Sequence, residues 1–223
     1  MVKGFNMNTP AVTILSLGFL TIIKRIKFGT KNRFPTDLNK NFWDWFGYSH
    51  AIDKDGNPLV LLHGTKSPEP FYSFEIDPQK KGIPSMFFTD NPHIAPAYIG
   101  IEGHVFPVYL SIQNPLIVDF SNQDPVFWNK IPFQGKKKKT DDIIREAFNS
   151  SSYDGVILKN ILDLGPRMNI FKDKDFRNKI KGLSEKQFRE LLAADIYAVF
   201  NPNQVKSVYN DGTWSKQTNN MYK

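Results

Sequence analysis

The amino-acid sequence predicts an α+β fold. Runs rich in Val, Ile and aromatic residues, which are typical of strands, are mixed with amphipathic segments that are typical of helices. The two kinds do not follow the regular βαβ order that a doubly wound sheet requires. The 223 residues suit one domain, and 19 Phe and 4 Trp supply large apolar side chains for its core. We assign residues 41–223 to this domain and residues 1–40 to an apolar segment and a linker.

The first predicted helix lies in NFWDWFGYS, residues 41–49. Phe42, Trp45 and Phe46 have the i, i+3, i+4 spacing that places side chains on one helical face. Gly47 follows in position for a C-terminal cap, because glycine adopts the left-handed conformation without strain. The pattern therefore predicts a short helix that ends at this glycine.

Three more helices are predicted further along the chain. Asn91 in NPHIAPAYIG is in position for an N-cap, with a proline at the first helical position. The segment TDDIIREAFN has Thr140 as its cap and two Asp in the first turn, where negative charge is favourable. The segment LSEKQFRELLAAD, residues 183–195, starts with a capping box formed by Ser184 and Gln187.

The other apolar runs predict strands. HAIDKDGNPLVLLHG is typical of a hairpin around an Asp-Gly turn, and Asn-Pro pairs divide two longer runs. IPFQGKKKKTDD, residues 131–142, is predicted to be a solvated loop. The predicted strand segments are residues 50–64, 85–90, 104–120 with a turn at 114–115, 153–163, and 196–210 with a turn at 201–202.

The N-terminal segment AVTILSLGFLTII, Ala11–Ile23, is apolar and is followed by KRIK. It is shorter than the roughly 20 residues that a membrane-spanning helix needs, and it lacks the cleavage site of a signal peptide. Three interpretations stay open: a buried or interfacial helix, an uncleaved signal-anchor-like element, or a segment of a larger parent protein. A cytoplasmic location, delivery as a secreted effector and membrane association through this segment are all compatible with the sequence.

The composition excludes several kinds of chemistry. The chain has no Cys, which excludes disulfides, thiolate zinc sites and a Cys nucleophile. The four His do not have metal-ligand spacing with carboxylates close by, so we expect no metal. The net charge of +7 indicates either a solvated basic surface or an anionic partner, such as dinucleotide phosphates, nucleic acid or a membrane.

The run NPLVLLHGTKS, residues 57–67, ends an apolar strand with His-Gly, as the oxyanion loop of an α/β-hydrolase does. Such a hydrolase also needs a Ser on a G-x-S-x-G elbow and a later catalytic His. The chain has no such elbow, and its last histidine is His104. This class is therefore excluded, and Walker A, G-x-G-x-x-G and H-E-x-x-H motifs are absent as well.

Seven motifs in order carry a resemblance to a known family: WFGYS, DKDGNPLVLLHGT, FYSFEID, MFFTDNPHIAPAY, VYLSIQNPLIVD, YDGVIL and YAVFNPNQVKS. From about residue 41 to 210 the chain resembles the ADP-ribosyltransferase domains of bacteriophage and mobile-element polyvalent proteins. These domains are distant relatives of the poly(ADP-ribose) polymerases. The resemblance implies two small packed β-sheets that form an NAD cleft, with peripheral helices around them.

The resemblance also implies roles for residues of the first motifs. His63 matches the histidine that binds the adenosine-ribose hydroxyl, and the backbone of Gly64 matches the group that grips the nicotinamide carboxamide, with Thr65 behind them. Phe87 and Tyr98 match the aromatic residues that contact the nicotinamide ring, and the strand position is a tyrosine in the relatives. Ala95 stands where the relatives carry a carboxamide-binding Ser.

The last motif departs from the polymerase pattern. Ile196 occupies the position of a glutamate that binds the nicotinamide-ribose hydroxyls, as in relatives that transfer a single ADP-ribose. Asp195 is on the opposite face of the strand, so it can replace that glutamate only through a β-bulge. Gln204 is the polar residue most typical of this subgroup, and we predict a catalytic role for it beside His63 and Tyr98, supported by Lys206 and Ser207.

These matches imply a mono-ADP-ribosyltransferase that cleaves NAD, its substrate, in a phage, mobile-element or toxin context. Its acceptor would be a protein, with nucleic acid as the alternative acceptor. A second hypothesis is a catalytically degenerate module of the same fold that binds NAD or an ADP-ribosylated partner. A third is a basic nucleic-acid-binding protein, which rests on the net charge and on GKKKKT.

Overall fold

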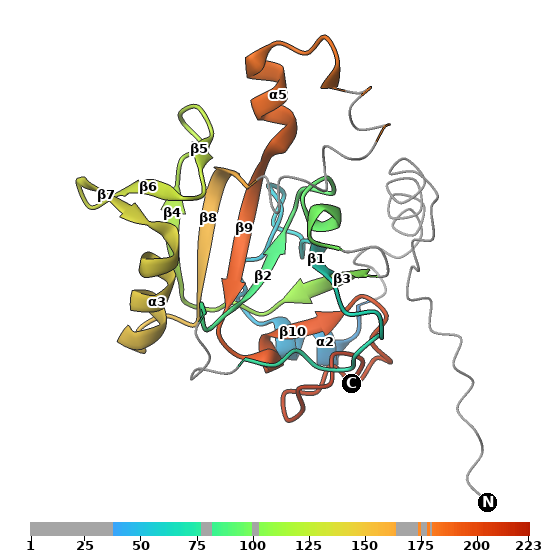
Figure 1. Ribbon diagram of the computed structural model, residues 1–223. Coiled ribbons are helices and arrows are strands. Elements are labelled where there is room, and N and C mark those ends of the chain that lie inside the picture. Colours follow the sequence, from blue (N-terminus) through green and yellow to red (C-terminus); the bar gives the residue numbers. More distant parts are fainter. Residues whose placement is uncertain (1–37, 77–81, 100–102, 164–173, 175–177, 179) are drawn as a thin grey trace, which may run out of the picture.

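The computed structural model describes residues 38–76, 82–99, 103–163, 174, 178 and 180–223, and these form an α+β domain (Figure 1). The apolar segment 11–23 and most of the predicted linker lie outside the described residues. Among the described residues no helix is long and apolar enough to cross a membrane. The helices are α2 (Lys40–Phe46), η2 (Ala95–Tyr98, 3-10), α3 (Thr140–Ser150), α5 (Glu185–Leu192) and η4 (Pro202–Gln204, 3-10).

One mixed sheet of eight strands forms the centre of the described domain. Along its path the order is β10-β3-β1-β2-β9-β8-β4, and β5 pairs with β8 beside that path. Neighbouring strands are antiparallel except where β4 and β5 run parallel to β8. The strands of this sheet are β1 (Leu61–Thr65), β2 (Met86–Thr89), β3 (His104–Leu110), β4 (Pro115–Asp119), β5 (Val126–Phe127), β8 (Gly155–Leu162), β9 (Ala193–Val199) and β10 (Val205–Ser207).

The two packed sheets that were expected are joined, in the described residues, into one continuous hydrogen-bonded path. Its narrowest junction is between β1 and β2, where Leu62 and Thr89 are the one registered pair. By contrast, β1 pairs with β3 along all five of its residues. In Figure 1 the strands β8 and β9 run nearly upright, whereas β3 and β10 lie across the view. The sheet thus has two halves that turn relative to each other at this junction.

Each face of the sheet has its own apolar core. Strand residues alternate between faces, so Phe87 and Ile196 point to one side and Phe88 and Tyr197 to the other. The first core includes the buried face of α3, with Ile144 fully buried. The second core gathers side chains from β1, β2, β3, β9 and β10. Each strand residue therefore points into one core or the other, and this decides which strand side chains can lie close together.

Helix α2 forms at the predicted place, with Phe42, Trp45 and Phe46 buried and Gly47 as its C-cap at φ 58°. Asn39 is its N-cap, and its side chain accepts a hydrogen bond from the Phe42 backbone. The three rings form a cluster with residues of β3 and the C-terminal segment. The predicted hairpin turn also forms, but its flanks meet in a single isolated bridge between residues 52 and 58.

Two helix predictions need correction. No α-helix starts at Asn91; its side chain accepts from the His93 backbone in a turn, and only the 3-10 helix η2 follows. The side-chain amide of Asn91 instead donates to the carbonyls of Leu191 and Ala193, at the end of α5. Helix α5 has the predicted capping box at Ser184 but ends at residue 192. The following residues belong to β9, because pairing with β8 outweighs local helix propensity.

The predicted loop 131–142 is also wrong, since most of it forms a two-stranded hairpin of β6 (Lys130–Phe133) and β7 (Lys136–Lys139). Gln134 and Gly135 have φ of 49° and 75°, the left-handed pair that a tight hairpin turn requires. Ile131 is fully buried and anchors the hairpin on the first core. Thr140 does not cap α3; its hydroxyl donates to the Trp128 carbonyl, and residue 139 is the N-cap.

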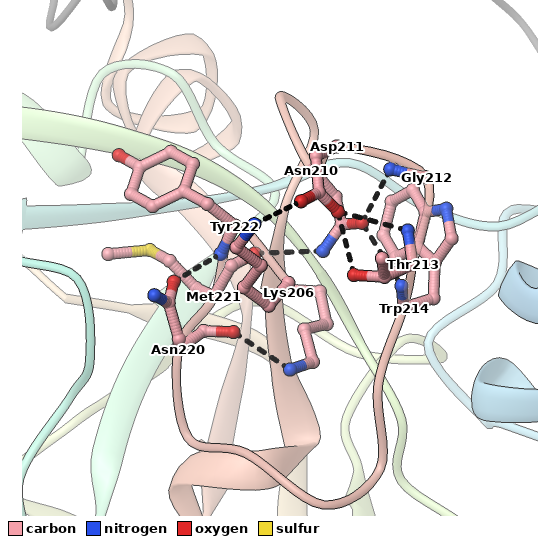
Figure 2. A network of polar contacts seen from close by, with 10 residues as sticks. Lys206, Asn210, Asp211, Gly212, Thr213, Trp214, Asn220, Met221 and Tyr222 are labelled. Atoms are coloured by element: carbon pink, nitrogen blue, oxygen red, sulfur yellow. Dashed lines mark hydrogen bonds and ion pairs between the residues drawn. The ribbon is translucent and has the colours of Figure 1, made fainter. Parts of the chain in front are cut away.

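The C-terminal segment is fastened to the sheet by one buried lysine. Lys206 in β10 is 0% exposed, and its Nζ donates to the carbonyls of Thr218 and Asn220, each at 2.9 Å. Burial lowers the pKa of Lys206 to about 8. Figure 2 shows this ammonium beside Asn220, with the Asn210 side chain bridging the same segment to the loop after β10. Lys206 therefore holds the chain end rather than supporting Gln204.

We predict that Lys206→Met lowers the free energy of unfolding by about 2–4 kcal/mol, because two buried carbonyls lose their donor. Chemical denaturation measures this change. Lys216→Met is the matched control, since Lys216 is exposed, and it should change stability by less than about 0.5 kcal/mol. Equal stability of the two variants would contradict the anchoring role.

Candidate functional site

His63 lies at the junction between the two halves of the sheet. Its Nδ1 is 2.7 Å from the carbonyl oxygen of Phe87, on the neighbouring strand β2. The imidazole packs edge-on against Phe74, with ring centroids 4.9 Å apart, and it is tilted against Phe88. The side chain of His63 therefore joins β1 to β2 just beyond the point where their main-chain pairing stops.

This contact fixes the protonation pattern of the His63 ring. A carbonyl oxygen only accepts, so Nδ1 carries the proton and donates. Burial lowers the pKa of His63, although the hydrogen bond to Phe87 opposes that shift. The ring is consequently neutral at physiological pH, with Nε2 as an acceptor. A neutral imidazole of this tautomer can receive a hydrogen bond from a sugar hydroxyl.

Gly64 is required by close packing against η2. A Cβ at this residue would lie 1.8 Å from the Ala95 carbonyl oxygen and 3.2 Å from Cβ of Tyr98. The first distance is far below any van der Waals contact, so only glycine lets the two segments approach this closely. The backbone of Gly64, the main chain at Ala95 and the base of Tyr98 thus form one compact unit.

Phe87 and Tyr98 both pack against the first core, on the face that also contains Ile196. Phe87 meets Trp128 edge-on, with centroids 5.6 Å apart. The Tyr98 hydroxyl donates to Oδ2 of Asp163 at 2.6 Å. Burial and the neighbouring Asp163 carboxylate both raise the pKa of Tyr98, so the phenol stays protonated.

Ile196 is 3% exposed and pairs with Thr89 and Leu158 on its two sides. A β-bulge does occur here, but in β8: the register shifts between Leu158 and Ile161, where Asn160 has φ 60°. Asp195 stays on the opposite face from Ile196, and its Oδ1 accepts from the Asn160 backbone at 3.0 Å. Asp195 therefore stabilises the bulge and does not reach the face of Ile196.

A second carboxylate lies beside Asp195. Oδ1 of Asp90 accepts from the Asp195 backbone N–H at 2.8 Å. Loss of solvation, and then repulsion from the Asp195 carboxylate, raise the pKa of Asp90 to about 6, even though the residue as a whole remains exposed. This acidic pair lies at the ends of β2 and β9, on the face away from Ile196.

The other predicted residues have different surroundings. Thr65 pairs with His104 at the end of β1, and its Oγ1 accepts from the Ser67 backbone. Gln204 lies beyond the far end of β9, where Oε1 accepts two backbone N–H groups and Nε2 donates to the carbonyls of Ser111 and Asp154. The structure places Gly64 against Tyr98 and links the His63 ring to the main chain at Phe87. The His63 ring packs with Phe74 and Phe88 of the second core, whereas the side chains of Phe87 and Tyr98 pack against the first core on the other face. The hydrogen bonds of Gln204 reach none of these residues. A catalytic role for Gln204 stays a prediction that this geometry does not favour.

Three residues that contact the predicted site residues have no site role predicted from the sequence: Phe74, Trp128 and Asp163. They contact His63, Phe87 and Tyr98 respectively. Asp163 is 65 positions from Tyr98 along the chain, so no local pattern could link them. Within the described residues, no group of three or more His, Asp or Glu side chains is placed to hold a metal ion.

Comparison with known sequences identifies the class of this domain as an ADP-ribosyltransferase. The matching family is described as "ADP-Ribosyltransferase in polyvalent proteins", and it matches residues 53–215, more than half of the chain, so the chain belongs to this family. This membership confirms the resemblance carried by the sequence motifs, and domains of this class use NAD as their substrate. No curated protein and no solved structure matches the chain.

We predict that Gly64→Ala forces η2 away from β1. Overpacking against a backbone carbonyl should lower the free energy of unfolding by about 1–3 kcal/mol, measured by chemical denaturation. Gly82→Ala is the matched control, because a methyl group added at Gly82 would meet no atom within 4 Å and its backbone is not in the left-handed region. A Gly64→Ala variant as stable as Gly82→Ala would contradict the close approach.

We predict that Asp90→Asn is more stable than the wild type at pH 7, because Asn keeps the acceptor oxygen and removes the repulsion. The folded-state pKa of Asp90, about 6, is above the ordinary 3.8, so ionised Asp90 lowers the free energy of unfolding, and this destabilisation is fully present above pH 6. It disappears as the pH falls from 6 towards 3.8. Thermal unfolding across this range should show the two melting curves converging at low pH, and a constant difference would refute the coupling.

Proposed function

We propose that this chain is a mono-ADP-ribosyltransferase that cleaves NAD and transfers ADP-ribose to a protein acceptor. The observation that carries the proposal is the packing of Gly64 against Ala95 and Tyr98, beside a neutral His63. Membership of the polyvalent-protein family supports it, and that family motivates a phage, mobile-element or toxin context. Nucleic acid is the alternative acceptor.

The chemistry places clear demands on these residues. Cleavage of the nicotinamide–ribose bond passes through an oxocarbenium-like transition state, so the dinucleotide must be held in a strained, well-oriented pose. We assign Nε2 of His63 to accept from a ribose hydroxyl and the Gly64 backbone to hold the carboxamide. The Tyr98 ring, fixed by its hydrogen bond to Asp163, would stack on nicotinamide, and Phe87 would border it.

Transfer of a single ADP-ribose, rather than chain elongation, is supported by the buried Ile196. A side chain without hydrogen-bonding groups cannot orient the nicotinamide-ribose hydroxyls or activate a second ribose. The same observation favours the second candidate function, a module that binds NAD or an ADP-ribosylated partner without turnover. Asp163 accepts the hydrogen bond of the Tyr98 phenol, and it positions that ring in either case.

The deciding experiment incubates the protein with NAD labelled in the adenosine and in the nicotinamide. We expect release of nicotinamide and transfer of the adenosine label for a transferase. Binding without release would establish the second candidate, and absence of both would overturn the proposal. Calorimetric titration with NAD supplies the binding measurement.

Two substitutions of His63 distinguish a role in NAD binding from a role in folding. His63→Asn keeps a donor for the Phe87 carbonyl but removes the acceptor at Nε2, so we expect an intact fold and at least about tenfold weaker NAD binding. His63→Ala removes both and should also lower the melting temperature. His63→Asn with unchanged NAD affinity would contradict the assignment of Nε2 to the ribose.

A further inference from the structure

The hairpin of β6 and β7 presents one strongly basic face. Its register pairs Lys130 with Lys139 and Pro132 with Lys137. Because side chains alternate across a strand, these four residues share the face opposite to the buried Ile131. We call Lys130, Lys137 and Lys139 the lysine face; all three are exposed.

This arrangement is unfavourable in the isolated domain. Like charges directly opposite each other in a strand pair destabilise it, as with Lys130 and Lys139. Lys138, on the other side of the hairpin, pairs with Glu146 and lies over the Phe133 ring. In the described part of the chain, no carboxylate is within ion-pair distance of the lysine face. The nearby Asp141 and Asp142 belong to the first turn of α3, where the helix dipole stabilises them.

An exposed aromatic residue, Phe127, precedes the hairpin along the chain. Phe127 is 46% exposed, and the guanidinium of Arg189 lies 5.6 Å from its ring centroid. Lys130 follows Phe127 closely along the chain, so their Cα atoms are at most about 10 Å apart. Lysines two positions apart on one strand repeat at about 6.8 Å, a spacing suited to a polymer with regularly repeated charge. An aromatic platform beside such lysines matches the requirements of single-stranded nucleic acid.

The hairpin is also connected to the candidate site. Trp128, between Phe127 and β6, packs on Phe87, and Thr140, the first residue of α3 directly after β7, donates to the Trp128 carbonyl. A polymer held on the lysine face would lie on the outer side of the hairpin, opposite to the side on which Ile131 packs into the first core with Phe87 and Trp128. The hairpin is therefore next to the candidate site, but its lysines are not among the proposed NAD-binding residues.

We propose that the lysine face together with Phe127 binds single-stranded nucleic acid through its phosphates and by stacking of one base. The binding is independent of base sequence, because lysines contact phosphates and the face carries no group that reads base edges. Single strands are favoured over a duplex, since only unstacked bases can reach the Phe127 ring. The inference goes beyond the proposed transferase function and does not depend on it.

The test measures fluorescence anisotropy of labelled 20-mer dT and rU, and of a duplex of equal length, without NAD and over a range of salt. The full chain is compared with Lys130→Gln/Lys137→Gln/Lys139→Gln and with Phe127→Ser. The control is Lys54→Gln/Lys181→Gln/Lys216→Gln, which removes the same charge from exposed lysines elsewhere. Vesicles with and without phosphatidylserine test the membrane alternative.

We expect the lysine-face variant to bind single strands at least about tenfold more weakly and to reduce the slope of log affinity against log salt by about 2. Phe127→Ser should weaken binding of single strands about tenfold and leave duplex binding unchanged. The control should stay within about twofold of the wild type. Three results would each overturn the proposal. They are an equal loss of affinity in the lysine-face variant and the control, an equal affinity for duplex and single strand, and binding to anionic vesicles without binding to nucleic acid.

Discussion

The arrangement of the domain depends on how β1 meets β2. Their main-chain pairing is reduced to Leu62 and Thr89, and beyond that pair the imidazole of His63 supplies the next connection, to the Phe87 carbonyl. The His63 side chain thus makes the next hydrogen bond between β1 and β2 after their main-chain pairing stops. The two halves of the sheet remain joined while they turn relative to each other, and the backbone of Gly64 can approach η2 instead of another strand. The same imidazole is both a structural link and the candidate ribose ligand.

The ionisable side chains near Ile196 and Asp195 differ in their partners on the two faces of the sheet. On one face the surroundings of Ile196 are apolar, and the ionisable side chains Tyr98 and Asp163 satisfy each other. On the other face Asp195 stabilises the bulge at Asn160. A bulge in β9 would be needed to turn Asp195 to the face of Ile196, but the bulge that is present lies in the neighbouring strand β8. Its Asn160 backbone N–H donates to the Asp195 carboxylate and keeps it on the opposite face.

Local sequence determined much of this fold. The helix at residues 40–46, the capping box of α5 and the strand that contains His63 and Gly64 follow from spacing and turn chemistry. The misplaced elements have tertiary causes: the β8 ladder draws Ala193 into a strand, and Ile131 anchors a lysine-rich hairpin that hydropathy alone marks as a loop. The contacts of Tyr98 with Asp163 and of Phe87 with Trp128 join distant segments, so no periodicity reveals them. Family motifs predicted roles for His63, Tyr98 and Gln204, and only the three-dimensional structure shows that the amide of Gln204 is already fully hydrogen-bonded to the main chain.

The enclosed position of Ile196 limits which side chains this strand position can accept. A glutamate there would place its carboxylate among Leu158, Ala198 and the first core, at a cost on the order of several kcal/mol unless its neighbours changed as well. The single substitution Ile196→Glu would therefore impair folding before the new carboxylate could contribute to binding or chemistry.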